Sequence, residues 1–312
     1  MKVLLISSYT FGYLDYAVEE MKSQGHKVVY FYYDRPPFKY SYKNKFYHLL
    51  SGMKKIFGIN EKKEYRHKFL VENLKNQKFD KILIVHGQYM LGKTHVFLKS
   101  ISKEYIAFFF DGLGKMPRQR NVIQYFDKIY SYDPEDCKNE NFTFLNNFIP
   151  TEKYRSRDYK YMVFNISSLD HRLEVTKRLA EYFNKKGVSY NFQLRTSKIK
   201  SLKNFKINKH SIDISETMKL IQDAKVILDI KRNDQSGLSF RPYEALGNEK
   251  KIITTNADIK NYDFYNPINI CIINEQNIEI PDEFFEIDYE QVPDEIYEKY
   301  SLRTWVKKVL NE

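Results

Sequence analysis

The chain of 312 residues is long enough for one large or two ordinary domains, each with its own core. Hydrophobic residues make up 42% of it, and no apolar run approaches the roughly 20 residues of a membrane-spanning helix, so we expect a soluble protein. The net charge of +11 would suit a nucleic-acid partner, but no helix-turn-helix, zinc-finger, RNP or KH signature accompanies it, which disfavours nucleic acid.

The first half of the chain alternates strand-like apolar runs with helical patterns. Residues 2–6 predict a strand, 13–23 a helix ended by Gly25, and 26–32 a second strand, which together form a βαβ unit of a parallel sheet. Further helices are predicted near 42–57 and 64–76, and further strands at 81–85, 106–110 and 128–132. The first βα loop has Gly12 alone and no Walker-type loop is present, which disfavours an NAD-binding protein, an ATPase and a kinase.

The second half restarts the same alternation. A strand is predicted at 161–166, a helix opened by 167–172 and closed by Gly187, and a strand at 190–194. Later elements are predicted at 216–223, 224–230, 269–273 and 300–310. We therefore expect an N-terminal Rossmann-like domain over 1–150, a C-terminal one over 151–300, and a terminal helix over 301–312.

The segment from Gln235 to Asn256 carries the strongest functional signal. The segment comes after a buried strand. It begins with a turn of small residues, continues with a helix that has Pro242 and Glu244 in its first turn, and ends in an apolar strand. At the carboxyl edge of a parallel sheet, Glu244 could hold a ribose diol and Arg241 a diphosphate. The alternative is a capped surface helix with a solvated Glu and Arg.

This segment resembles the signature of nucleotide-sugar glycosyltransferases with the GT-B fold. In those enzymes a Gly-Leu turn precedes a helix bearing Glu-Ala-Leu, and an Ile-Ile-Thr-Thr-Asn strand follows; the matching residues here are 237–238, 244–246 and 252–256. The resemblance implies an α/β fold of two Rossmann-like domains with parallel sheets facing across a cleft, and a ribose bound by Glu244. Many retaining members carry a second Glu where this chain has Ser236, so the stereochemistry stays open.

Three segments of the first half support the same family. Residues 105–111, 125–136 and 144–150 resemble the end of the first domain in bacterial spore-maturation-like and lipopolysaccharide or capsule glycosyltransferases. In that family the terminal helix commonly crosses back onto the first domain. The candidate donor-binding residues are Glu244, Arg241, Gly237, Leu238, Ser236, Gln235, Lys231, Arg195, Ser168 and Arg172. For Ser168 and Arg172 the alternative is an ordinary N-cap and an exposed helix residue.

The candidate catalytic bases each end an apolar strand. Asp111 comes first, beside Gly112 and Gly114, and His86 second; a turn aspartate and a hydrogen-bonded core histidine are the alternatives. No Asp-x-Asp motif occurs, and the two cysteines lack metal-ligand spacing, so we expect no metal, no disulfide framework and a reducing cytoplasm. We also expect no cofactor, with a UDP- or GDP-linked sugar as the donor substrate.

Residues 39–68 form a basic, aromatic-rich segment, with nine Lys or Arg against Glu61 and Glu64. Such a helix can lie on an anionic membrane, which would place the protein at the inner face of the cell membrane beside a lipid-linked acceptor. The commoner use of the pattern is packing on its own domain.

Three functions follow from these patterns. The first is transfer of a sugar to a surface polysaccharide or glycolipid, the second a non-catalytic nucleotide-sugar-binding or assembly protein, and the third a sugar-nucleotide epimerase. We expect replacement of Glu244 by alanine to weaken nucleotide binding and leave the fold intact.

Overall fold

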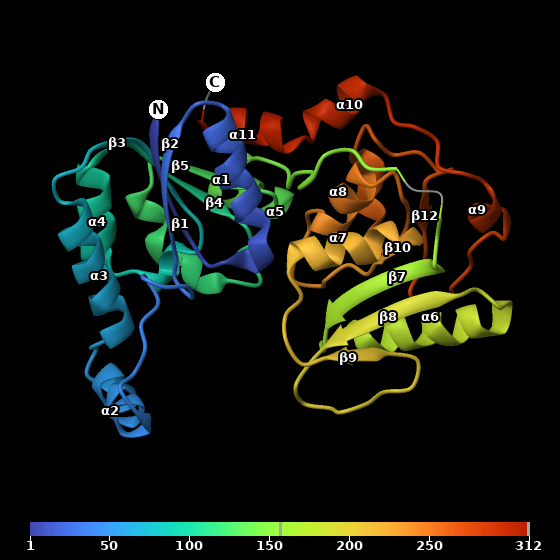
Figure 1. Ribbon diagram of the computed structural model, residues 1–312, viewed down its shortest axis with the longest axis horizontal. Helices are drawn as coiled ribbons and strands as arrows, with labels where there is room; N and C mark the ends of the chain where they lie inside the picture. The colour runs from blue at the N-terminus through green and yellow to red at the C-terminus, as the bar shows by residue number, and fades with distance from the viewer. Residues whose placement is uncertain (156–157, 311–312) are drawn as a thin grey trace. The chain divides into compact units, whose positions relative to one another are not determined.

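The computed structural model describes residues 1–155 and 158–310, and the chain divides into two compact units (Figure 1). The first unit comprises Met1–Thr10 and Ala17–Leu145, and the second comprises Phe11–Tyr16 and the chain from Asn146 onward. Phe11–Tyr16, although near the start of the sequence, therefore belongs with the second half. The predicted boundaries at 150 and 300 stay predictions, and residues 156–157 and 311–312 lie outside the described residues.

The first unit is built on a parallel sheet of six strands, in the order β2-β1-β3-β4-β5-β6. Its strands are β1 (Lys2–Ser7), β2 (Lys27–Tyr32), β3 (Phe79–Ile84), β4 (Ser102–Phe109), β5 (Lys128–Ser131) and β6 (Thr143–Phe144). The chain moves from β1 outward to β2 and then returns to β3 on the other side of β1. The strand order therefore reverses between β1 and β3, where open α/β sheets bind ligands.

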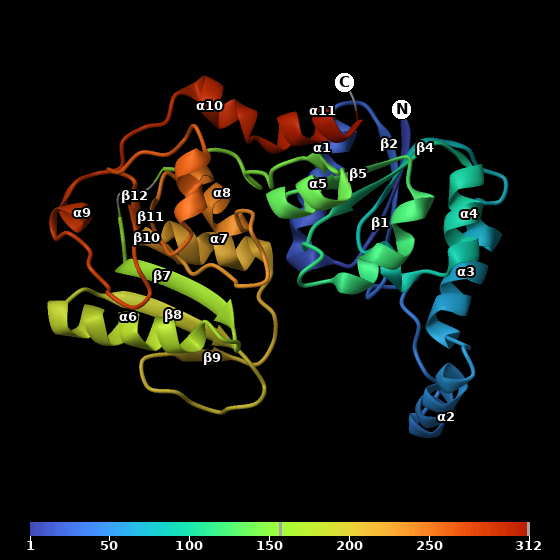
Figure 2. The same cartoon turned by 180° about the vertical axis from the view of Figure 1, so that it is seen from behind.

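Helices surround this sheet: α1 (Tyr13–Ser23), α2 (Lys45–Ile56), α3 (Glu61–Leu74), α4 (Gly92–Ser100) and α5 (Pro134–Glu140). Leu70 and Leu74 of α3 and Leu98 of α4 pack in one cluster with Leu4 and Ile82 of the sheet. Burying several such side chains, at about 1.5–3 kcal/mol each, fixes α3 and α4 on that face. α2 instead lies at the far end of α3, away from the strands (Figures 1 and 2).

The second unit repeats this architecture, with strand order β12-β11-β10-β7-β8-β9, all parallel. Its strands are β7 (Tyr161–Ser168), β8 (Tyr190–Arg195), β9 (Lys206–Asn208), β10 (Ala224–Asp229), β11 (Lys251–Thr254) and β12 (Ile270–Ile272). Here the order reverses between β7 and β10. The loops that follow these two strands thus occupy the ligand-binding edge of the sheet.

The helices of the second unit are α6 (Leu173–Lys186), α7 (Ile214–Gln222), α8 (Phe240–Gly247), α9 (Glu283–Glu286), α10 (Asp294–Lys299) and α11 (Leu302–Leu310). Leu179 and Phe183 of α6 share a buried cluster with Val226 of β10 and with Phe284 and Phe285 of α9. The helices α7 and α8 lie on the opposite side of the sheet from α6 (Figures 1 and 2).

The predicted fold class, α/β with two Rossmann-like parallel sheets, is confirmed. One local prediction was wrong: residues 167 and 168 do not open a helix. They end β7, and α6 begins only at Leu173, after a loop. The parallel pairing of β7 with β8 continues through Ser167 and Ser168, so both serines remain in the strand. Within 1–155 and 158–310, no helix is both long and apolar enough to span a bilayer.

Candidate functional site

The loop after β10 and the start of α8 are held together by one buried carboxylate. Asp229 ends β10 and accepts hydrogen bonds from Ser239 Oγ (2.9 Å) and Thr254 Oγ1 (3.1 Å). Thr254 is its register partner on β11, so the two side chains share a face. Burial raises the pKa of Asp229, because the charged form loses hydration there. Asp229 was not among the residues predicted from sequence, although an acid that ends an apolar strand is a recognisable signal.

Ser239 also forms the N-cap of α8. Its side chain accepts from the backbone N–H of Arg241 at 3.1 Å, which satisfies one of the free donors of the first turn. Pro242 is the third helical residue, where a missing N–H costs nothing. Glu244 is the fifth, so its predicted place in the first turn was wrong: Ser239, rather than a residue nearer Pro242, starts the helix.

Glu244 and Arg241 form an ion pair in which the carboxylate is buried and the arginine side chain is 20% exposed. The Glu244 side chain has no exposed surface and accepts from Arg241 Nη1 and from the hydroxyl of Tyr13. Burial disfavours the charged guanidinium, but the adjacent carboxylate outweighs it and raises the pKa of Arg241. Glu244 is therefore directed into the protein and Arg241 is mostly covered, so the alternative of a solvated Glu and Arg on a surface helix does not apply.

Tyr13 is a residue that the sequence analysis did not find. Its ring packs on Phe240, the first residue of α8, with the ring centroids 4.2 Å apart. Burial, with the Glu244 charge beside it, raises the pKa of Tyr13 well above its ordinary value, so the hydroxyl stays a donor. A ribose diol at Glu244 would have to replace this hydroxyl as the hydrogen-bond donor. No local pattern marks Tyr13, because 231 residues separate it from Glu244.

A cluster of two arginines and two aspartates lies where the strand order reverses. Arg172 binds Asp170 through Nε (2.9 Å) and Nη2 (2.7 Å), after β7. Arg232, after β10, donates a hydrogen bond to the same Asp170 at 3.1 Å. It also donates two hydrogen bonds to Asp234, at 2.9 and 2.8 Å. Of these residues the sequence analysis named only Arg172. The two guanidiniums are fork-shaped donors of the kind that bind phosphate groups.

The remaining predicted donor residues are spread along the same edge. Lys231 Nζ pairs with Asp258 at 2.7 Å, which directs it to the loop after β11. Arg195 donates to Ser211 Oγ at 2.7 Å, and its backbone register partner is Ser168. Gly237 and Leu238 are buried, whereas Gln235 and Ser236 are half-buried in the loop before them.

The two candidate bases lie together in the first unit. His86 follows β3 and Asp111 follows β4, and Nε2 of His86 is 3.6 Å from Oδ2 of Asp111, within ion-pair range but too long for a hydrogen bond. Lys115 Nζ binds the other carboxylate oxygen at 2.5 Å. Burial favours the neutral acid, but His86 and Lys115 prevail and lower the pKa of Asp111 to about 2. Asp111 is thus fully ionised near neutral pH and a weak base.

His86 is a buried side chain on an unusual backbone conformation. Its backbone is left-handed (φ 63°, ψ 45°), which is uncommon for a residue other than glycine. Nε2 faces Asp111, and Nδ1 is a buried nitrogen without a hydrogen-bond partner among the described residues.

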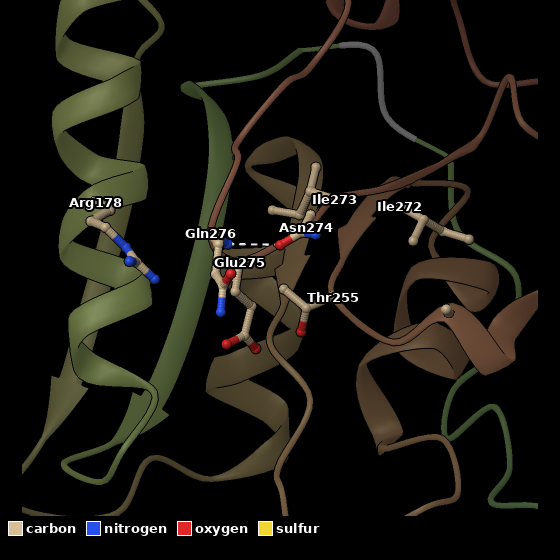
Figure 3. Close-up of a pocket in the computed structure, with 8 residues that line it drawn as sticks. Arg178, Thr255, Ile272, Ile273, Asn274, Glu275 and Gln276 are labelled. Atoms are coloured by element: carbon tan, nitrogen blue, oxygen red, sulfur yellow. Dashed lines mark hydrogen bonds between the residues drawn. The ribbon is translucent and has the colours of Figure 1, made fainter.

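A separate hollow of about 730 Å³ opens at the strand ends of the second unit (Figure 3). Arg178 of α6 faces it from one side, and Thr255, Asn274 and Gln276 line it after β11 and β12, with Gln276 N–H donating to Asn274 Oδ1 at 2.8 Å. None of the predicted donor-binding residues lines this hollow.

The fold is similar to those of two kinds of nucleotide-sugar enzyme. The spinosyn forosaminyltransferase SpnP superimposes with a TM-score of 0.53 at 10% identity, covering 100% of this chain and 98% of that one. The UDP-GlcNAc 2-epimerase of Methanocaldococcus jannaschii superimposes at 0.52 with 11% identity, covering 100% of both chains, and that of Rickettsia bellii at 0.50 with 12% identity, covering 100% and 95%. No protein-family model and no curated protein sequence matches the chain. At this identity the likeness shows the GT-B fold alone.

Proposed function

We propose that the protein is a glycosyltransferase that moves a sugar from a UDP- or GDP-linked donor to a hydroxyl of a surface polysaccharide or glycolipid, such as lipopolysaccharide or capsule. The observation that carries the proposal is the Arg241–Glu244 pair, whose carboxylate is buried, on the helix that follows β10 at the edge where the strand order reverses. Its carboxylate would bind the ribose, with the hydroxyl of Tyr13 displaced. The capped start of α8 and Arg241 would face the diphosphate.

The arginine cluster has the second role in this proposal. When the bond between the sugar and the diphosphate breaks, negative charge develops on the leaving oxygen, and fixed cationic donors stabilise it. Arg172 and Arg232 supply such donors at the reversal point, each held in place by a carboxylate. This assignment adds Arg232 to the predicted donor-binding residues.

We assign the base to His86, with Asp111 as its positioning partner, which reverses the order expected from sequence. The proton of the acceptor hydroxyl would pass to the His86 imidazole as the oxygen attacks the anomeric carbon and the bond from that carbon to the diphosphate breaks. Asp111, held ionised, would stabilise the imidazolium through Nε2. An aspartate with a pKa of about 2 has little affinity for that proton.

A donor-hydrolysis assay, together with a thermal-shift screen against UDP, GDP and CMP sugars, tests the proposal. We expect one nucleotide to stabilise the protein, and its sugar donor to be hydrolysed slowly without an acceptor. Nucleotide binding without turnover on any glycan would instead indicate a binding or assembly protein. No stabilisation by any nucleotide would contradict all three functions.

The epimerase remains the second candidate, because the M. jannaschii enzyme superimposes on the whole chain as well as the transferase does. An epimerase isomerises the donor itself and needs no acceptor. Isomerised sugar nucleotide recovered after incubation of the donor alone would favour it over transfer.

A further inference from the structure

Helix α2 leaves most of its large apolar side chains exposed, unlike an ordinary surface helix, and among its residues only Ser51 is buried. Ser51, in the middle of the helix, is only 1% exposed, whereas Ile56 is 83% and Phe57, the residue that caps its end, is 80% exposed. The expectation that the apolar residues of 39–68 pack on their own domain is therefore wrong for Ile56 and Phe57.

Polar contacts fix the inward side of α2. The hydroxyls of Tyr42 and Ser51 are 3.2 Å apart, and Lys54 forms a 2.6 Å ion pair with Glu61 at the start of α3. Asn44 caps the helix by accepting from the N–H of Tyr47 at 3.0 Å. These contacts hold the helix in one rotation about its axis, with its apolar side outward.

The outward side is a continuous stripe. Phe46, Leu49, Met53 and Ile56 follow one another at intervals of three, four and three residues, so they lie along one line of the helix, and all four are exposed. Phe57 and Ile59 extend the apolar surface beyond the end of the helix. Large apolar side chains that are contiguous and exposed mark an interaction surface, since isolated ones are normal but clusters are not.

The exposed charges within the α2 segment are all positive, and Glu61, which pairs with Lys54, belongs to α3. No Asp or Glu occurs between residues 40 and 60, and Lys43, Lys45 and Lys55 are exposed in that segment. A second copy of the chain would bring the same positive charges against each other. An anionic lipid surface instead accepts the apolar stripe among its acyl chains and the lysines among its headgroups.

We propose that α2 docks the protein on the surface of an anionic membrane, with the stripe of Phe46, Leu49, Met53 and Ile56 inserted at the interface. The helix is 12 residues long, or about 18 Å, which suits a helix lying in the plane of the interface. This docking does not depend on the proposed transferase activity.

The docking helix is connected to the carboxyl edge of the first sheet. Arg66 of α3 donates to the carbonyl of Tyr89 at 2.9 Å, and Tyr89 lies three residues after His86. The start of α3, which follows α2, therefore lies at the edge that carries His86. A membrane attached through α2 would present lipid-linked molecules on that side of the first unit.

Flotation of the full chain with vesicles tests the docking. We expect it to float with vesicles containing phosphatidylglycerol and not with pure phosphatidylcholine. Replacing both Leu49 and Ile56 with serine should weaken binding by at least about tenfold. Charge reversal at Lys43, Lys45 and Lys55 should weaken it by about a hundredfold or more.

Matched controls separate this surface from general effects of apolarity and charge. Val96→Ser removes an exposed apolar residue of α4, and charge reversal at Lys138, Lys185 and Lys307 changes the net charge by the same amount elsewhere. Both controls should bind vesicles like the wild type. The proposal is overturned if the wild type does not bind anionic vesicles, or if the controls lose as much binding as the α2 variants. It is also overturned if the wild type binds no vesicles and light scattering shows a dimer that the double variant Leu49→Ser, Ile56→Ser converts to a monomer.

Discussion

Asp229 accepts a 2.9 Å hydrogen bond from Ser239, and the same serine oxygen accepts from the N–H of Arg241, so one hydroxyl joins the end of β10 to the start of α8. The position of the Arg241–Glu244 pair at the sheet edge depends on this connection, because Ser239 fixes where the helix begins.

The Asp229 carboxyl predicts a specific dependence of stability on pH. Its pKa in the folded state is raised above the ordinary 3.8, so folding favours the protonated form. The contribution of Asp229 to the free energy of unfolding is therefore fully present below pH 3.8 and is lost as the pH rises through the raised pKa. Asp229→Asn has no carboxyl to ionise, so its stability should not fall over this pH range. Urea unfolding of both proteins at a series of pH values measures it, and parallel curves for the two proteins would contradict the raised pKa.

Tyr13→Phe should change stability and nucleotide binding in opposite directions. The variant loses one hydrogen bond to a buried carboxylate, which we expect to lower the free energy of unfolding by about 1.5–3 kcal/mol. It also removes the donor that a ribose would have to displace, so UDP or GDP should bind more tightly. Urea unfolding and titration calorimetry measure the two effects. Weaker nucleotide binding in Tyr13→Phe would show that the hydroxyl contacts the ligand instead.

Glu244→Ala should destabilise the fold, contrary to the expectation from sequence. Removing the carboxylate leaves the mostly covered Arg241 guanidinium without its counter-charge, at a cost of about 3–5 kcal/mol. Replacing the two residues together, Glu244→Leu with Arg241→Met, should recover much of that loss while nucleotide binding stays absent. Equal destabilisation by the single and the double variant would show that packing, not charge, sets the cost.

The His86–Asp111 pair predicts which of the two residues acts as the base. With its pKa near 2, Asp111 is ionised throughout the neutral range and has little affinity for a proton there. His86→Asn should lower kcat by about 10²–10⁴-fold. Asp111→Asn should lower kcat by a smaller factor, because it removes only the positioning partner. An unchanged rate in His86→Asn would remove it from the proposed mechanism.

Arg232→Met should weaken binding of the diphosphate and not of the nucleoside. Calorimetry with UDP and with uridine separates the two, and loss of one charged hydrogen-bond donor should cost UDP about 1.5–3 kcal/mol. Arg178→Met, at the exposed hollow of Figure 3, is the matched control and should bind UDP normally. If only the Arg178 variant is impaired, the nucleotide binds in that hollow instead.

Local sequence patterns were enough to predict most of the individual helices and strands. Apolar runs such as 224–230 and the helix over 13–23 follow from periodicity and end signals, and these alternating elements determined the α/β class. Strand ends were predictable too, and His86 and Asp111 follow β3 and β4 as expected.

Contacts between side chains from distant parts of the chain could not be predicted in this way. Tyr13 reaches Glu244 across 231 residues of sequence, and Arg232 shares Asp170 with Arg172 because β7 and β10 are neighbours in the sheet. The outward side of α2 was likewise invisible in sequence. Periodicity shows that a helix has an apolar side, but the direction of that side depends on contacts such as Tyr42–Ser51 and Lys54–Glu61, which are made between elements.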